Sequence, residues 1–154
     1  MIRLVALMIA LVCIVPALAA PLPAGLDPQN TIFLDTRYGR VIIRLRPELA
    51  PKHAERGDGT GKSKYPDLPA EFSKVPFTRG VVGMARATSP NSANSQFFIM
   101  FGETPSLNGQ YTVVGEVVSG MEVIDRIKKG SSANNGAVTD PDRIVRMEVA
   151  ADAK

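Results

Sequence analysis

The stretch from Val82 to Phe101 constrains the fold of this chain most, because it joins a strand of small residues, a polar loop and an aromatic strand. Strict alternation sorts the aromatic strand onto two mostly apolar faces. One face carries Phe97, Ile99 and Phe101, and the other carries Gln96, Phe98 and Met100. A strand that is apolar on both faces is expected to lie in the interior of a β domain.

Gln96 is the polar residue of the second face, and two interpretations of it remain open. Phe98 and Met100 could form the apolar floor of a pocket, with the Gln96 amide holding a neighbouring polar backbone. Alternatively, the segment is a core strand, and the Gln96 amide makes its hydrogen bonds to other groups of the same chain.

The rest of the chain predicts further short strands and one clear helix. Strands are expected at residues 31–36, 40–46, 80–87, 110–118 and 145–149. The first two should form a hairpin around Tyr38-Gly39, with Val41, Ile43 and Leu45 of the second strand facing inward. A helix should follow residue 118, with a capping box, an apolar stripe and a terminal glycine. These are Ser119 with Glu122, then Met121, Ile124 and Ile127, and finally Gly130.

A second helix begins near Pro47, but the glycine-rich run from Gly57 stops it after about two turns. That run ends like a phosphate-binding loop, yet Arg56 stands where its first glycine would be needed, so a nucleotide site is not expected. The residues thus predict a mostly β domain with one or two helices.

The N-terminus has the pattern of a secretory signal peptide. Arg3 gives a positive start, residues 4–15 are apolar, and Ala17-Leu18-Ala19 offers a cleavage site. We therefore expect a signal peptide at 1–19, a linker at 20–30 and one domain at 31–150. The mature protein should be periplasmic or secreted, without stable membrane association.

Composition argues against several kinds of chemistry. Cys13 lies in the signal peptide and His53 is the lone histidine. The mature chain therefore lacks the set of side chains that a metal site or a nucleophilic catalytic triad requires. We expect no cofactor. Of the 18 basic residues Arg3 lies in the signal, which leaves 17 against 15 acidic residues. That formal charge of +2 is too small and too scattered to indicate nucleic-acid binding.

Four ordered motifs resemble the cyclophilins, the cyclophilin-type peptidyl-prolyl cis-trans isomerases. The core signature is residues 83–87 (Gly-Met-Ala-Arg-Ala) with 91–99 (Asn-Ser-Ala-Asn-Ser-Gln-Phe-Phe-Ile). The others are residues 36–41 with 50–53, residues 65–72, and residues 107–115. The resemblance implies a closed antiparallel β-barrel with capping helices, here with two strands missing, and a monomer that binds proline-containing polypeptides.

The resemblance also implies roles for individual residues. Phe98, Leu107 and Tyr111 would form the wall of a proline pocket, and Gln96 would orient the substrate. Ala85, Arg86 and Ala87 would form an edge whose backbone pairs with the peptide. Tyr111 replaces a histidine common in the family, and Ser106 stands where some members have tryptophan.

The chain departs from the family between Arg56 and Gly57. There the family continues through two strands that carry the arginine donating to the imide nitrogen, and a phenylalanine, a methionine and a glutamine of the pocket. Three hypotheses follow. The chain is a peptidyl-prolyl isomerase for exported proteins, a proline-peptide-binding module with little or no activity, or a truncated or mis-assembled gene product that folds poorly.

Overall fold

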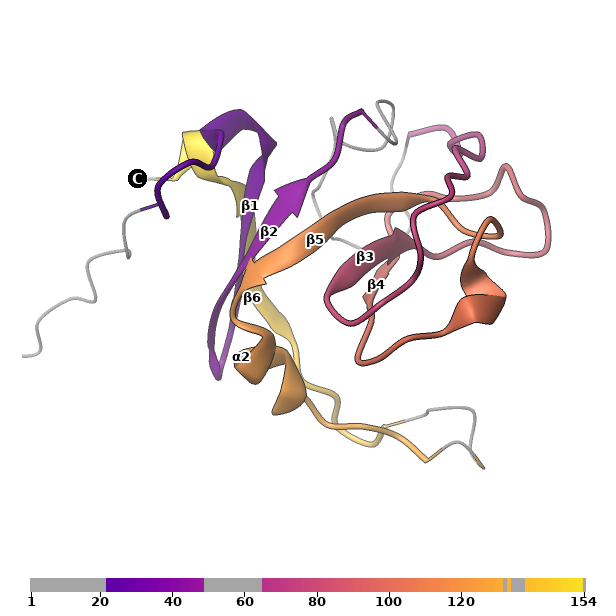
Figure 1. The fold of residues 1–154 in the computed structure, drawn as a ribbon. Coiled ribbons are helices and arrows are strands. Elements are labelled where there is room, and N and C mark those ends of the chain that lie inside the picture. The colour runs from indigo at the N-terminus through magenta and orange to yellow at the C-terminus, as the bar shows by residue number, and fades with distance from the viewer. Residues whose placement is uncertain (1–21, 49–64, 132, 134–137, 154) are drawn as a thin grey trace, which may run out of the picture.

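The computed structural model describes residues 22–48, 65–131, 133 and 138–153 (Figure 1). They contain one six-stranded sheet in the order β4-β3-β5-β2-β1-β6, in which every neighbouring pair is antiparallel. The strands are β1 Thr31–Thr36, β2 Gly39–Leu45, β3 Val81–Met84, β4 Phe97–Ile99, β5 Val113–Ser119 and β6 Ile144–Val149. One short helix, α2 (Met121–Asp125), and 3-10 turns at Pro28–Asn30, Pro105–Leu107 and Ala150–Asp152 complete the described elements.

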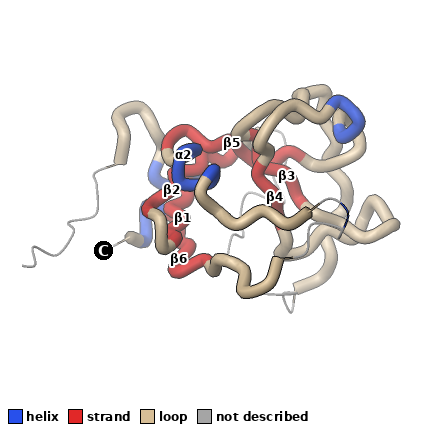
Figure 2. The backbone as a smooth tube through the Cα atoms, turned by 90° about the horizontal axis from the view of Figure 1, so that it is seen from below, coloured by secondary structure: helices blue, strands red, loops and turns tan. Residues whose placement is uncertain are grey.

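The sheet curls strongly, so that β3 and β4 lie on one side of the molecule and β1, β2 and β6 on the other (Figure 2). Its terminal strands β4 and β6 do not pair with each other, and within the described residues the sheet is an open half-barrel. The predicted mostly β, incomplete barrel is confirmed. The second predicted helix, His53 and the junction at Arg56 lie outside the described residues.

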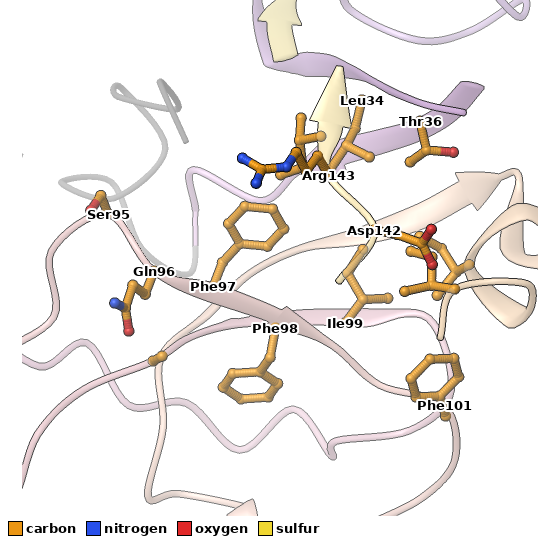
Figure 3. Close-up of a pocket in the computed structure, with 14 residues that line it drawn as sticks. Leu34, Thr36, Ser95, Gln96, Phe97, Phe98, Ile99, Phe101, Asp142 and Arg143 are labelled. Atoms are coloured by element: carbon orange, nitrogen blue, oxygen red, sulfur yellow. The ribbon is translucent and has the colours of Figure 1, made fainter. Parts of the chain in front are cut away.

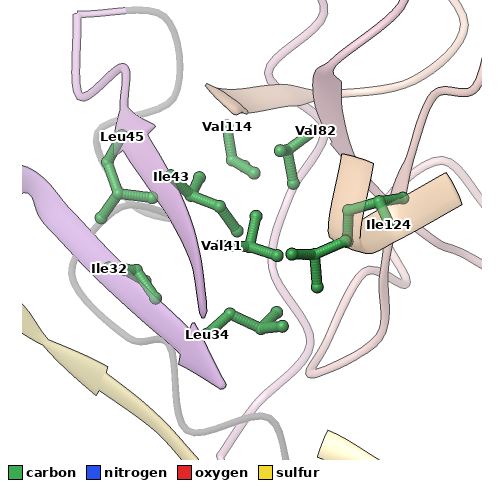
Figure 4. Packing of buried hydrophobic residues seen from close by; sticks show 9 residues of the cluster. Ile32, Leu34, Val41, Ile43, Leu45, Val82, Val114 and Ile124 are labelled. Atoms are coloured by element: carbon green, nitrogen blue, oxygen red, sulfur yellow. The ribbon is translucent and has the colours of Figure 1, made fainter. Parts of the chain in front are cut away.

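The main core lies inside the curl, where α2 packs against β2 (Figure 4). Val41, Ile43 and Leu45 point into it, as the alternation predicts, and each is less than a tenth exposed. The core consists of Ile32, Leu34, Val41, Ile43, Leu45, Val82, Val114, Val123 and Ile124. The first hairpin is also confirmed, with β1 and β2 paired from Thr31 opposite Arg44 to Thr36 opposite Gly39.

The predicted capping of α2 is wrong at both ends. Ser119 is still paired with Ile42 as the last residue of β5, so it cannot cap the helix. The N-cap is Gly120, at φ 94°, and no side chain caps the helix there. The helix ends at Asp125 rather than near Gly130, because the chain turns so that the Lys128 N–H donates to the Asp142 carboxylate at 2.8 Å.

None of the helices in the described residues is long and apolar enough to cross a membrane.

Candidate functional site

Three residues predicted to form a pocket wall converge on one cluster of side chains. Phe98 comes from β4, Leu107 from the 3-10 turn, and Tyr111 from just before β5; all three pack against a second core that includes Met100. The Phe98 and Tyr111 rings meet edge to face with centroids 5.7 Å apart. The fold therefore gathers these residues from separate elements into one apolar surface.

Phe77 completes this aromatic cluster, and the motifs did not identify it. Its ring stacks on Phe98 with centroids 5.7 Å apart and meets Tyr111 edge to face at 6.5 Å. The Phe77 N–H donates to the Asn108 side chain at 2.8 Å, and its carbonyl accepts from Thr104 at 2.9 Å. Because these contacts span about thirty residues of sequence, a local pattern could not reveal them.

Arg86 clamps one side of the aromatic cluster. Its guanidinium carbon lies 4.7 Å from the centre of the Tyr111 ring. The Nε and Nη2 atoms donate to the Gln110 carbonyl at 3.2 and 3.1 Å, and Nη1 donates to the carbonyls of Ala87 and Thr88. The Arg86 side chain is therefore engaged in holding Tyr111, and this conformation does not present it to a ligand.

The predicted peptide-binding edge alternates in its hydrogen bonding. The Ala85 N–H donates to the Gln96 carbonyl at 2.8 Å, and the Ala87 N–H donates to the Ser92 hydroxyl at 3.0 Å. Within the described residues, the intervening N–H of Arg86 has no acceptor. An extended ligand could pair with that group, whereas the N–H groups of Ala85 and Ala87 already have acceptors.

Gln96 immediately precedes β4 and is exposed. Figure 3 shows its amide and the Phe98 ring on one side of the strand, with Phe97 on the opposite side. The predicted alternation of the two faces is thus present. The side chain is placed to bond a ligand that lies against Phe98.

A second hollow, not predicted from the sequence, lies on the other face of β4. It is a cavity of about 460 Å³. Its apolar lining includes Leu34, Phe97, Ile99, Phe101, Ile124, Ile127 and Ile144, and Ala85, Gln96 and Phe98 also border it. Phe97, Ile99 and Phe101, which alternation assigns to one face, all border this cavity, and the curl of the sheet brings Leu34 and Ile144 to it from β1 and β6.

The polar side of this cavity is organised by Asp142, whose side chain is 2% exposed. Its carboxylate accepts from the Lys128 N–H and the Tyr38 hydroxyl and contacts the Arg37 guanidinium at 3.4 Å. The bond from the Lys128 backbone, followed by those neighbours, lowers the pKa of Asp142 below its ordinary value.

Two other arginines, Arg37 and Arg79, lie elsewhere. Arg79 makes a two-pronged pair with Asp125 at 2.6 and 3.0 Å, and Arg37 lies over Tyr38. Within the described ranges, no second guanidinium is placed over the aromatic cluster. The same ranges hold no group of three or more His, Cys, Asp or Glu side chains that could bind a metal ion.

Comparison with known proteins identifies a family. The model of the "Cyclophilin type peptidyl-prolyl cis-trans isomerase/CLD" family matches residues 55–149. A "Probable peptidyl-prolyl cis-trans isomerase" of Brucella suis biovar 1 (strain 1330) is 50% identical over 169 residues, covering 83% of this chain and 86% of the relative. "Peptidyl-prolyl cis-trans isomerase-like 3" of Gallus gallus is 42% identical over 78 residues, covering 46% of this chain and 47% of that protein.

Solved structures agree on the fold. Cyclophilin AquaCyp293 from Hirschia baltica superposes with a TM-score of 0.72 at 21% identity, covering 84% of this chain and 77% of its own. A Cryptosporidium parvum cyclophilin-type isomerase, solved in the presence of the dipeptide Ala-Pro, superposes with a TM-score of 0.64 at 20% identity. The match covers 77% of this chain and 98% of that chain.

The alignment with the Brucella suis relative also shows that this chain is shorter within the matched region. It spans 169 positions, while 83% of 154 residues is about 128, so about 41 aligned positions have no residue in this chain. This total of unmatched positions agrees in size with the expectation that a segment is missing.

Proposed function

This chain belongs to the cyclophilin-type peptidyl-prolyl cis-trans isomerases, and from that premise we propose that it accelerates cis/trans interconversion of X-Pro bonds in exported polypeptides. The aromatic cluster carries the proposal, since it brings Phe98, Leu107 and Tyr111 together with Gln96 at its edge. The predicted signal peptide supports the assignment to exported clients and to a periplasmic or secreted location.

The reaction needs a twisted peptide bond to be favoured over both planar forms, since amide resonance creates a barrier of roughly 18–20 kcal/mol. The aromatic cluster would hold the proline ring on Phe98, Leu107 and Tyr111. The Gln96 amide and the Arg86 backbone N–H would hold the adjoining backbone, leaving the preceding carbonyl free to rotate. No proton is transferred and no covalent intermediate forms.

The second candidate function is binding of proline-containing peptides without turnover. Catalysis benefits from a donor aimed at the imide nitrogen, whose lone pair appears as resonance is lost. Arg86 is the guanidinium beside the cluster in the described residues, and its donors are bonded to the carbonyls of Gln110, Ala87 and Thr88. Losing one such donor typically slows a reaction about 100- to 1,000-fold.

NMR exchange spectroscopy on an Ala-Pro peptide tests both candidates with one sample. The full chain would be expressed in an exporting bacterial host and compared with the Gln96→Ala variant. The variant should slow the added exchange about fivefold, because one net hydrogen bond contributes about 1 kcal/mol. Gln29→Ala is the matched control, because that glutamine lies in the 3-10 turn at Pro28–Asn30.

The possible outcomes separate the hypotheses. Added exchange that Gln96→Ala leaves unchanged would exclude the proposed site. Peptide shifts at Phe98 and Tyr111 without added exchange would establish the binding module. Neither signal, together with poor dispersion of the protein spectrum, would indicate the truncated chain that folds poorly.

A further inference from the structure

Among the described residues, strand β4 has one free edge. On its other side it pairs with β3, where the Met100 N–H donates to the Val81 carbonyl at 2.9 Å and the Gln96 carbonyl accepts from Ala85. Bonding groups in an antiparallel ladder alternate along the strand, so the N–H and C=O of Phe97 and Ile99 point away from β3. In the order of the described strands, β4 has no second neighbour.

The same edge borders the apolar cavity. Phe97 and Ile99 of β4 and Leu34 of β1 line it (Figure 3), and so does Ile144 of β6. Both terminal strands of the open sheet thus line one hollow of about 460 Å³. Ser95 also borders it, and its hydroxyl is buried without a hydrogen-bond partner in the described part of the chain. Backbone donors, backbone acceptors and apolar surface are therefore offered together.

We propose that the free edge of β4 and the adjoining cavity bind an extended segment of a client polypeptide that carries apolar side chains at alternate positions. Such a segment would add a strand to the sheet, with backbone bonds giving affinity and the cavity giving specificity. The site is continuous with the aromatic cluster, because Gln96 and Phe98 border both. Naming the partner as a client rests on the proposed function.

Pairing geometry specifies the bound strand closely. Every neighbouring pair in this sheet is antiparallel, and we assign the bound strand the same direction. A residue directly opposite Phe97 or Ile99 would then exchange both backbone bonds with it and place its side chain on the cavity face. The residue opposite Phe98 would make no bond to β4 and would face the aromatic cluster. A proline, which lacks an N–H, fits that position without losing a hydrogen bond.

Charge at the cavity adds a preference. Arg143 borders the cavity and has no hydrogen-bond or ion-pair partner in the described residues. Its neighbour Asp142 is already bonded to Lys128 and Tyr38 and paired with Arg37, so it leaves the Arg143 charge uncompensated. An acidic residue beside the apolar stretch should therefore strengthen binding.

A second copy of the chain fits this site less well. The other free edge, β6, contains a register shift opposite Asp35/Thr36 and carries Arg146 and Glu148. Bulges and charges of this kind discourage pairing between sheet edges. A client segment can pair with the backbone of β4 and also place apolar side chains in the cavity.

The test uses proline-free peptides, so that its failure is distinguishable from failure of the proline site. The parent probe is Glu-Val-Thr-Val-Thr-Val-Thr, and its matched control has the same composition in blocks, Glu-Val-Val-Val-Thr-Thr-Thr. Two further probes carry N-methyl groups on the valines or on the threonines. Binding to the full chain is followed through the amide signals of Phe97 and Ile99, with Gln29 of the 3-10 turn at Pro28–Asn30 as the reference.

The parent should bind at least about tenfold more tightly than the block peptide. N-methylation of the valines should weaken binding about tenfold or more, because the two N–H donors that pair with the Phe97 and Ile99 carbonyls are lost. N-methylation of the threonines should leave binding unchanged. Replacing the glutamate by lysine should weaken it. Equal binding of all peptides would mean that the cavity binds apolar side chains without strand pairing, and it would overturn the proposal. A dimer in sedimentation velocity whose Phe97 and Ile99 signals do not respond to peptide would also overturn it.

Discussion

The position of the Phe98 ring depends on a residue without a side chain. Gly83 lies opposite Phe98 in the pairing of β3 with β4. A Cβ atom there would lie 2.5 Å from the Phe98 ring and 2.7 Å from the Phe77 ring, closer than atoms pack. The two aromatic rings can therefore stack across β3 only because this position is glycine.

Gly83→Ala should displace Phe98 and disrupt the aromatic cluster. Overpacking of this kind costs about 1–3 kcal/mol, so we expect a lower urea midpoint and loss of the shifts that an Ala-Pro peptide induces at Tyr111. Gly102→Ala is the matched control, since an added Cβ there meets nothing within 4 Å. An unchanged peptide response in Gly83→Ala would show that the rings of the cluster do not hold the proline.

The residues of the site differ in how far the sequence predicts them. Alternation alone placed Gln96 and Phe98 on one face of β4, because a strand repeats every two residues. Leu107 and Tyr111 were assigned through the family resemblance. Phe77 was missed, since it lies in an irregular segment and is positioned by contacts with Thr104 and Asn108. Whether these residues bind substrate stays a prediction.

At the scale of elements, Asp142 ties the segment before β6 to the end of α2 and to the first hairpin. It accepts from the Lys128 N–H after the helix and from the Tyr38 hydroxyl in the turn between β1 and β2. This long-range tie also explains why the helix stops earlier than its apolar stripe predicts. A pattern in the sequence of the helix itself carries no information about a carboxylate 14 residues further on.

Asp142→Asn should reduce stability in a manner that depends on pH. The folded-state pKa of Asp142 is lowered, chiefly by the Lys128 N–H. Its ionised form therefore stabilises the fold above the ordinary pKa of an aspartate, about 4, and that contribution is lost as the pH falls through the lowered pKa. Urea unfolding of both proteins from about pH 7 to pH 3 should show a stability difference that shrinks toward acid.

The control for this titration is Asp152→Asn, which changes an exposed aspartate in the last 3-10 turn. It should have little effect on stability at any pH in the series. A stability difference for Asp142→Asn that stayed constant down to acid would mean that the second acceptor oxygen, rather than the negative charge, maintains the tie, because an amide has only one acceptor oxygen.

At the scale of the whole molecule, the strands could be predicted and the openness of the sheet could not be derived from them. Each strand is a local pattern of alternating apolar residues, so its existence is visible in the sequence. Closure depends on which strands become neighbours. The absent closure was anticipated only by comparing the chain with a family, and the described sheet does end at β4 and β6 without a pair between them.

Restoring the absent segment should raise activity and occupy the free edge. At the junction between Arg56 and Gly57, where the family resemblance places the missing segment, we would insert the corresponding residues of the Brucella suis relative. If they supply a donor to the imide nitrogen, Ala-Pro exchange should accelerate about 100- to 1,000-fold. If they also pair with β4, the alternating Val-Thr peptide should no longer shift the amide signals of Phe97 and Ile99.

Faster exchange with the peptide still bound would separate the two effects and show that the inserted donor acts without closing the sheet at β4. No acceleration in a folded, longer chain would show instead that the present residues already set its rate.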